Sequence, residues 1–242
     1  SGVLNEPARG ALVEKFGGVK IKDLTLIDGK AVLLSPRAEA ALAREPGVLR
    51  IDDDVEVFAL DKPIEINRVR PGSVQVQPAQ VLPWGIDRID AEKVWTTTTA
   101  DPIKVAIVDT GIEKTHPDLQ ANIKDGVSTV AYTTNYNDDN GHGTHVAGIV
   151  AAIDNTIGVI GVGPKIDLYA VKVLDRRGSG YLSDVIEGLD WAIANGMQVV
   201  NMSLGTASYN KSFEDAVKRV NAAGITQVAA AGNSGPGNTT VI

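Results

Sequence analysis

The chain has 242 residues, 43% of them hydrophobic and 22% charged, which is typical of a globular protein with one large and one small domain. No run of about 18 apolar residues occurs, so the sequence predicts no membrane-spanning segment. The formal net charge of −7, without a basic stripe, argues against a nucleic-acid partner. The absence of cysteine excludes disulfides and thiolate metal sites.

The first 60 residues predict a small α+β module. Its expected elements are a helix over residues 7–16, a hairpin of Val19 to Ile27 and Ala31 to Leu34 around an Asp28-Gly29 turn, a helix from Ser35-Pro36 to about Glu45, and extended segments at Val48 to Ile51 and Val55 to Leu60. This α-β-β-α-β order is that of a ferredoxin-like split β-α-β-β-α-β module without its first strand. We therefore expect the natural chain to begin upstream of Ser1.

Two polar stretches border this module. The run Asp52-Asp53-Asp54 is typical of a solvated edge, and the alternative is a contact with the N-termini of a partner's helices, whose dipoles attract carboxylates. Residues 61–80 contain three prolines and no hydrophobic period, so they predict a linker.

The pattern changes after residue 100 to buried strands that alternate with helices. The expected strands are 103–108, 168–173, 198–202 and 225–230, and the expected helices are 143–152, a segment from Ser183 to Asn195-Gly196, and 212–223 with a capping box at Ser212-Phe-Glu-Asp215. Continuous apolar strands that alternate with helices predict an α/β fold with a doubly wound parallel sheet.

Polar residues follow three of these strands directly. Asp109 follows the first strand, Ser203 the third and Asn233 the fourth, each within two residues of a glycine. Turn chemistry explains any one of them alone. In doubly wound sheets, however, functional groups gather beyond the carboxyl ends of the strands. Three such exits, together with a glycine-flanked His142, indicate a site.

His142 begins a helix made of very small residues, including Ala147, Gly148 and Ala151, which predicts close contact with a neighbouring backbone. The positive end of the helix dipole favours the neutral ring, which can act as a base. An acid such as Asp109 beside a histidine is the pairing that nucleophilic catalysis needs, and an asparagine amide can donate to a developing oxyanion.

Four blocks in order resemble the subtilisin-like serine proteases, from about Gln80 to the C-terminus. They are Val108-Asp-Thr-Gly-Ile112 with His116-Pro-Asp-Leu119, Asn140-Gly-His-Gly-Thr-His-Val-Ala-Gly148, Asn201-Met-Ser-Leu-Gly205 and Ala230-Ala-Gly-Asn-Ser-Gly235. Residues 7–60 resemble the inhibitory propeptide of that family. The resemblance divides the chain into a propeptide (1–60), a linker or mature N-terminal extension (61–80) and the N-terminal part of a catalytic domain (81–242).

The resemblance implies a role for each matching residue. Asp109 is expected to be the triad acid, His142 the general base and Asn233 the oxyanion donor. An extended substrate is expected to pair between two edges, which are Gly178-Ser179-Gly180 and Ser203-Leu204-Gly205. The propeptide, a chaperone and inhibitor in this family, would place Val57 to Leu60 in that cleft and be cut between Leu60 and Asp61.

The chain departs from the family in one respect. The family nucleophile lies in a Gly-Thr-Ser-Met-Ala block well after the oxyanion asparagine, and no such block occurs before Ile242. Ser208 directly follows the substrate-edge block, so it is not assigned as nucleophile. We expect the 242-residue chain to be inactive alone and to need the C-terminal remainder of the catalytic domain. A catalytically inactive relative that only binds peptides or its own propeptide is the alternative.

The resemblance also implies calcium as a cofactor. The expected ligands are oxygens of Gln80, Asp118, Ile153, Asn155, Ile157 and Val159. Zinc at His116, His142 and His145 is a weaker alternative, because the last two lack the i,i+4 spacing of helical zinc motifs. The family further implies polypeptide substrates and a secreted enzyme, while no leader is visible at residue 1.

Overall fold

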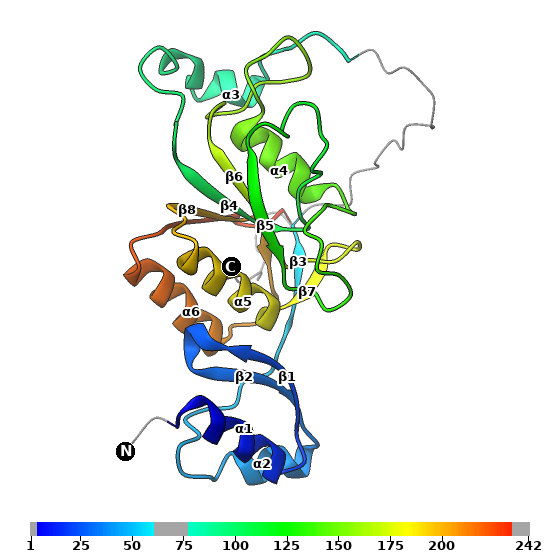
Figure 1. Ribbon diagram of the computed structural model, residues 1–242, viewed down its shortest axis with the longest axis vertical. Coiled ribbons are helices and arrows are strands. Elements are labelled where there is room, and N and C mark those ends of the chain that lie inside the picture. Colours follow the sequence, from blue (N-terminus) through cyan, green and yellow to red (C-terminus); the bar gives the residue numbers. More distant parts are fainter. Residues whose placement is uncertain (1–3, 61–76, 234–242) are drawn as a thin grey trace.

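The computed structural model describes residues 4–60 and 77–233. A five-stranded parallel sheet forms its centre, with the strand order β10-β8-β4-β6-β5 (Figure 1). The strands are β4 (Lys104–Asp109), β5 (Ile123–Ser128), β6 (Asp167–Lys172), β8 (Val199–Met202) and β10 (Thr226–Ala229). Four of them lie within one residue of the expected bounds. β5 was not predicted, because Lys124, Asp125 and Gly126 interrupt its apolar pattern.

Helices cover both faces of this sheet. They are α4 (His142–Ala151), α5 (Leu182–Ala194) and α6 (Lys211–Ala222), and the short α3 (Trp84–Arg88) and a 3-10 turn (Ala91–Lys93) precede the sheet. Val105 and Ile107 of β4 pack in one buried cluster with Ala147 of α4. Ala106 and Val108 pack in the other cluster, with α5 and α6. Successive residues of one strand thus reach opposite layers, which confirms the doubly wound α/β fold.

The N-terminal module contains the expected hairpin between two helices. Its elements are α1 (Glu6–Lys15), β1 (Val19–Leu24), a 3-10 turn (Thr25–Ile27), β2 (Gly29–Leu33) and α2 (Pro36–Leu42). Ser35 caps α2 through a bond from Ala38 N–H, as expected. The prediction of strand to Ile27 is wrong, because Leu26 turns inward and is buried. The prediction of helix to Glu45 is also wrong by three residues.

The segment after α2 does not continue the hairpin's sheet. Residues 48–51 form no strand, which corrects the prediction of an extended strand there. The next strand, β3 (Glu56–Ala59), instead pairs antiparallel with β7 (Ser179–Tyr181) and β9 (Leu204–Gly205) of the larger domain. The described part of the module therefore has a two-stranded sheet, and its last strand is donated to its neighbour.

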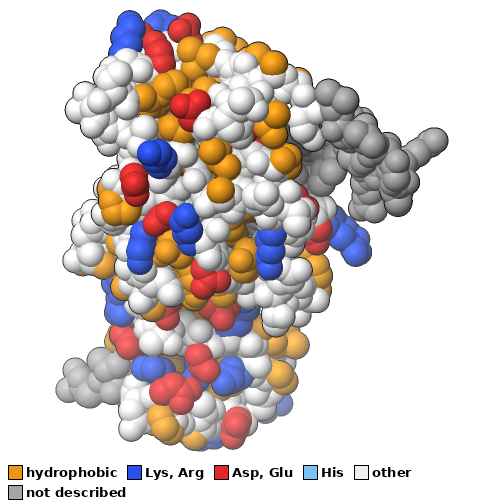
Figure 2. Space-filling view, turned by 45° about the horizontal axis from the view of Figure 1, so that its top comes forward, with side chains coloured by type: hydrophobic (Ala, Val, Ile, Leu, Met, Phe, Trp, Pro, Cys, Tyr) orange, Lys and Arg blue, Asp and Glu red, His pale blue; other side chains and the backbone are white. Residues whose placement is uncertain are grey.

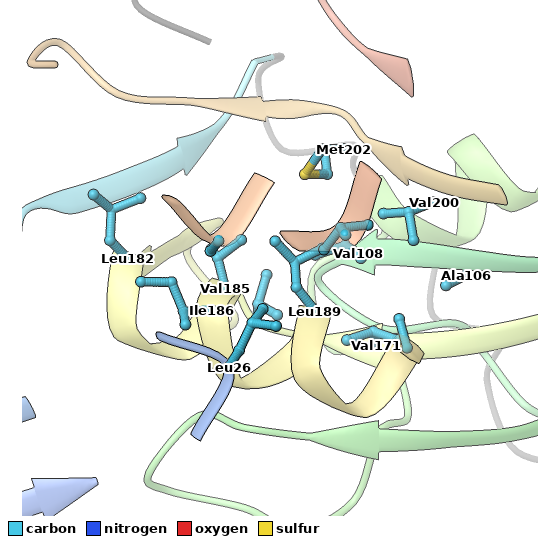
Figure 3. Close-up of a cluster of buried hydrophobic side chains, with 14 of the residues drawn as sticks. Leu26, Ala106, Val108, Val171, Leu182, Val185, Ile186, Leu189, Val200 and Met202 are labelled. Atoms are coloured by element: carbon cyan, nitrogen blue, oxygen red, sulfur yellow. The ribbon is translucent and has the colours of Figure 1, made fainter. Parts of the chain in front are cut away.

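The module packs across α5 and α6 (Figure 1). Leu26 belongs to the same buried cluster as Ile186 and Leu189 of α5, and the three side chains lie together in Figure 3. Burial of one such side chain stabilises the folded state by about 1.5–3 kcal/mol. The hairpin's apolar residues are therefore stabilised mainly by the larger domain.

Two aspartates of the run 52–54 cap these helices. Asp54 accepts bonds from Ser183 N–H (2.9 Å) and Ser183 Oγ (2.7 Å) at the start of α5. Asp52 accepts from Ser212 N–H at 3.0 Å and from its Oγ at 2.6 Å in the first turn of α6. The contact with helix N-termini is thus the correct alternative for this run. The predicted capping box at Ser212 is wrong, because Asn210 is the N-cap of α6.

The surface agrees with the composition. On the face shown in Figure 2, acidic and basic side chains are interspersed and neither sign forms a continuous patch. Among the described residues, no helix is both long enough and apolar enough to cross a membrane.

Candidate active site

Asp109 and His142 meet at the carboxyl edge of the sheet. Asp109 is the last residue of β4 and His142 the first of α4, and both are buried. His142 Nδ1 lies 2.7 Å from Asp109 Oδ1 and 2.9 Å from Oδ2. This contact fixes the ring orientation and leaves Nε2 as the ring nitrogen that can exchange a proton with a substrate group.

Burial raises the pKa of Asp109 above its usual value, whereas the hydrogen bonds from His142 and from Thr110 N–H act in the opposite direction. Thr110 N–H donates to Asp109 Oδ1 at 2.7 Å. The carboxylate therefore has fixed donors on both sides, so its position relative to the ring is set before any substrate binds.

The small residues of α4 serve close contact between backbones, as expected from the sequence. A Cβ on Gly143 would lie 2.2 Å from Gly111 O, a separation that real Cβ atoms essentially never show, and 3.2 Å from Asp109 Oδ1. Only glycine therefore lets the first turn of α4 approach the end of β4 closely enough for His142 to reach Asp109.

Asp138 is a positioning residue that the sequence reasoning missed. Its carboxylate accepts bonds from the N–H groups of Asn140, Gly141 and Thr144 and from the Thr144 hydroxyl, at 2.6–3.0 Å. It thus replaces the N-cap side chain that Gly141 lacks. The sequence feature that points to this role is an aspartate three residues before Gly141, the glycine that directly precedes the helix.

Residues 56–60 occupy the cleft between the two predicted substrate edges. Val57 pairs with Gly180 and Phe58 with Ser179, while Phe58 and Ala59 pair with β9 on the other side. Ala59 N–H donates to Gly178 O at 2.8 Å, and Leu60 N–H donates to Ser203 O at 3.3 Å. The segment is an added strand between two edges, the arrangement in which main-chain bonds hold an extended peptide.

Asn233 lies beside the predicted scissile position. Its side-chain Nδ2 donates to the carbonyl oxygen of Leu60 at 2.7 Å. The structure therefore shows two of the expected pairings, that of Asp109 with His142 and that of the Asn233 amide with the carbonyl of Leu60. Asp61 lies outside the described residues. Ser208 lines a different cavity of about 340 Å³ beside Val57, Leu182 and Leu204.

Several of the predicted calcium ligands contact one another. The side-chain amide of Gln80 points at the carbonyl oxygens of Ile153 (2.7 Å) and Val159 (3.2 Å). Asn155 contacts Asp118 Oδ1 at 2.8 Å, and Asp118 is buried. Ile157, the remaining residue of the predicted ligand set, forms a backbone bridge with Ala79.

These residues fit a hard cation. A Cβ on Gly158 would lie 2.4 Å from Asp118 Oδ2, so the loop leaves room at that carboxylate which any other residue would fill. The set contains one carboxylate with amide and carbonyl oxygens, which suits calcium. Rotation of the Gln80 amide by half a turn would direct its oxygen, in place of Nε2, toward the carbonyl oxygens of Ile153 and Val159.

The structure does not support the alternative of a zinc site at His116, His142 and His145. In the described ranges no group of three His, Cys, Asp or Glu side chains is arranged to hold a metal ion. His142 contacts Asp109, and His116 Nδ1 instead accepts a bond from Asp118 N–H within its own turn at 3.3 Å.

Residues 100–242 match the model of the Subtilase family, so the chain belongs to that family. It is 44% identical over 209 residues to the alkaline protease of Alkalihalobacillus alcalophilus, covering 86% of this chain and 50% of that protein. It is 38% identical over 231 residues to subtilisin E of Bacillus subtilis (strain 168), covering 95% and 55%. The thermostable alkaline protease of Halalkalibacterium halodurans is 49% identical over 164 residues, covering 67% and 45%. The chain thus spans about half the length of these relatives.

Proposed function

We propose that this chain is part of the precursor of a subtilisin-type serine endopeptidase. The observation that carries the proposal is a pair of contacts: the Asp109 carboxylate holds the His142 ring, and the Asn233 amide donates to the peptide carbonyl of Leu60. Membership of the Subtilase family supports the reaction class. The relatives named proteases support polypeptides as substrates.

Each group has one step in the proposed reaction. His142 accepts the proton of a serine hydroxyl as that oxygen attacks the carbonyl, and later returns a proton to the leaving amine. Asp109 stabilises the imidazolium formed in between. Asn233 donates to the oxygen that becomes negative. The nucleophilic serine is expected in the C-terminal remainder of the catalytic domain, so the 242-residue chain is expected to be inactive alone.

Residues 1–60 act in this proposal as chaperone and inhibitor. Occupation of the cleft by residues 56–60 supports inhibition, because a substrate cannot pair with the same two edges. Capping of α5 and α6 by Asp54 and Asp52 supports a role in folding, because the caps satisfy donors that those helices otherwise leave to water. The bond between Leu60 and Asp61 is the proposed cleavage site, and export of the enzyme is part of the same proposal.

A test needs the precursor extended by its own coding sequence beyond Ile242. We expect a fluorophosphonate to label the extended precursor once residues 1–60 are released, and not to label the 242-residue chain. The same extended precursor carrying His142→Ala is the matched control and should stay unlabelled and unprocessed. Binding of peptides without labelling would favour the inactive relative instead. A processed N-terminus near Gln80 would contradict cleavage after Leu60.

Calcium is the proposed cofactor, held by oxygens of Gln80, Asp118, Ile153, Asn155, Ile157 and Val159. The bound ion would tie the segment around Gln80 to the loop after α4. At a hundredfold excess of free ion over the dissociation constant, binding to the folded state alone stabilises it by about 2.7 kcal/mol.

The calcium site predicts a melting temperature that rises with calcium and falls with a chelator. Gly158→Ala should abolish the rise, because the added Cβ would crowd Asp118 Oδ2. Asp154→Asn is the control, because that neighbouring carboxylate is exposed and lies outside the ligand set. A melting temperature that ignores both calcium and chelator would remove the site from the proposal.

A further inference from the structure

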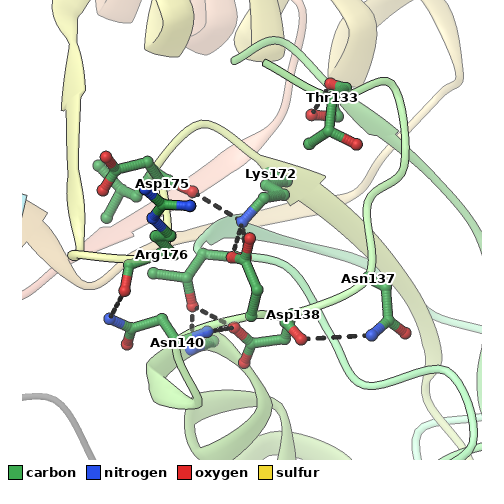
Figure 4. A network of polar contacts seen from close by, with 12 residues as sticks. Thr133, Asn137, Asp138, Asn140, Lys172, Asp175 and Arg176 are labelled. Atoms are coloured by element: carbon green, nitrogen blue, oxygen red, sulfur yellow. Dashed lines mark hydrogen bonds and ion pairs between the residues drawn. The ribbon is translucent and has the colours of Figure 1, made fainter. Parts of the chain in front are cut away.

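Lys172, the last residue of β6, is a charged side chain that is fully buried. Burial of an ammonium is strongly unfavourable unless its hydrogens find acceptors. Lys172 Nζ lies 2.6 Å from Thr110 O, 2.7 Å from Asp139 Oδ1 and 3.0 Å from Leu174 O (Figure 4). Because an ammonium has three hydrogens, these three acceptors use all of them.

The three acceptors belong to three segments of the proposed active site. Thr110 follows Asp109 at the end of β4, and Asp139 lies three residues before His142. Leu174 precedes the loop that leads to the substrate edge at Gly178. The Lys172 side chain therefore connects the backbone next to Asp109 to the loop that precedes His142.

Thr110 extends this connection to both partners. Its N–H donates to Asp109 Oδ1 at 2.7 Å, while its hydroxyl donates to Asp138 and accepts from Gly143 N–H, each at 2.9 Å. Every polar group of Thr110 is thus engaged, and Lys172 holds its carbonyl. A shift of this residue would move the carboxylate and the first turn of α4 relative to each other.

Asp139 completes the arrangement from the surface side. Its side chain is 39% exposed, whereas that of Lys172 is 0% exposed. Its second carboxylate oxygen accepts a bond from the Tyr132 hydroxyl at 2.7 Å. A methionine would fill the volume of Lys172 without joining the loops, so packing alone does not account for a lysine at this position.

We propose that Lys172, paired with Asp139, is a positioning residue that holds Asp109 and His142 in register for proton transfer. The inference rests on the proposed function, because it assigns a role toward the same pair. The alignment of Asp109 with His142 can nevertheless be measured in the 242-residue chain, and this measurement needs no enzymatic turnover.

Proton NMR of the 242-residue chain tests the positioning directly. We expect Lys172→Met and Asp139→Asn to weaken or abolish the low-field resonance of the His142 Nδ1 proton. Lys172→Met should also lower the pKa of His142, because a misaligned carboxylate stabilises the imidazolium less. Loss of the positive charge alone would raise that pKa. Lys104→Met is the matched control. Lys104 is the first residue of the adjacent strand β4, so it lies at the end of the strand opposite to Asp109.

An unchanged resonance together with a raised pKa of His142 in Lys172→Met would overturn the proposal. If Lys172→Met does not fold, the test relies on Asp139→Asn, which is better tolerated because Asp139 is partly exposed. An unchanged resonance of the His142 Nδ1 proton in Asp139→Asn would overturn the proposal equally. In the processed, extended enzyme, Asp139→Asn should lower kcat by about a hundredfold, with KM unchanged. A raised KM at constant kcat would contradict positioning. Absence of any activity in the unmodified enzyme would refute the proposed function and leave the NMR result standing.

Discussion

The N-terminal module and the parallel-sheet domain combine the same kinds of elements but are stabilised differently. Within the described residues, the sheet domain has side chains such as Ile107, Leu168 and Leu189 with no exposed surface. In the hairpin and helices of the module, even the most buried apolar side chains, such as Leu42, keep 6–8% of their surface exposed. Leu24, Leu26 and Ala31 moreover belong to the cluster shared with α5 and α6. A module with so little core of its own folds best against a partner surface.

Charged contacts join the two regions. Lys22 of β1, largely buried, contacts Asp184 and Glu187 of α5, the latter at 2.6 Å. Arg50 contacts Asp215 of α6 at 3.0 Å. The partly exposed Arg50–Asp215 pair contributes about 0–1 kcal/mol. In the buried Lys22–Asp184 pair, the cost of removing both charges from water offsets much of their attraction. The shared apolar cluster and the helix caps therefore dominate the docking energy. The module resembles a bound ligand more than a second domain.

The largest expected effect is the loss of stability when a core leucine of the sheet domain is replaced, compared with the same replacement in the module. Leu168→Ala should destabilise the sheet domain by about 2–5 kcal/mol, because it leaves a cavity in a fully buried cluster that no residue of the module joins. Leu42→Ala, the same change in α2, should reduce hydrogen-exchange protection only in residues 4–43. Exchange mass spectrometry of both variants distinguishes the regions. Equal loss of protection in the sheet after Leu42→Ala would show a single cooperative unit and contradict the comparison.

A smaller effect is expected at the helix caps. Asp54→Ala should weaken docking of the module by about 0.5–2 kcal/mol, because Ser183 N–H at the start of α5 loses its acceptor. Exchange of amides in residues 4–43 should accelerate, while β4 stays protected. Asp53→Ala is the control, because it removes the same charge next to Asp54, whereas the bond that the described structure shows at Asp53 is to its backbone carbonyl. Similar effects of both substitutions would assign the docking to overall negative charge rather than to the cap.

The strands and the acid–base pair were predictable because their signals are local. Continuous apolar runs such as 104–108 have few other interpretations, and a polar residue at their exit must lie at the carboxyl edge of the sheet. Asp109 and His142 therefore meet as expected. Val57 to Leu60 was also expected in the cleft from the resemblance to propeptides, and the strand β3, which contains Val57 to Ala59, pairs with both edges.

The supporting residues were not predictable because their partners are distant in sequence. In the sequence, Lys172 is simply a charged residue near the end of a predicted strand. Thr110, which accepts its hydrogen bond, lies 62 positions away. Asp138 was overlooked because one aspartate in a polar loop has many uses. β5 has no apolar run of its own and forms only by pairing with β6. Tertiary context decides such positions, so sequence patterns alone do not identify them.

The smallest expected effect is a response of the module to acid. Lys20 and Lys30 both bond to Asp23, and these bonds lower the pKa of Asp23 from 3.8 to about 2. A carboxyl whose pKa is lowered on folding stabilises the folded state above its unfolded pKa, and this contribution is lost as the pH falls from 3.8 through about 2. Lys30, whose side chain is 4% exposed, stays charged and loses a partner in that range.

Hydrogen exchange of the β1–β2 amides, measured as the pH falls from 5 to 2, should therefore show the module opening before the sheet domain. In Asp23→Asn the hairpin should already be less protected at pH 5, and its further loss on acidification should be smaller. Lys15 and Glu45, an exposed pair elsewhere in the module, provide the control through Glu45→Gln, which should leave the acid response of the hairpin unchanged. An Asp23→Asn hairpin that opens with the same acid profile as the unmodified chain would assign the sensitivity to the interface with α5 instead. In that case the module would respond to acid through its docking surface and not through its own ion pairs.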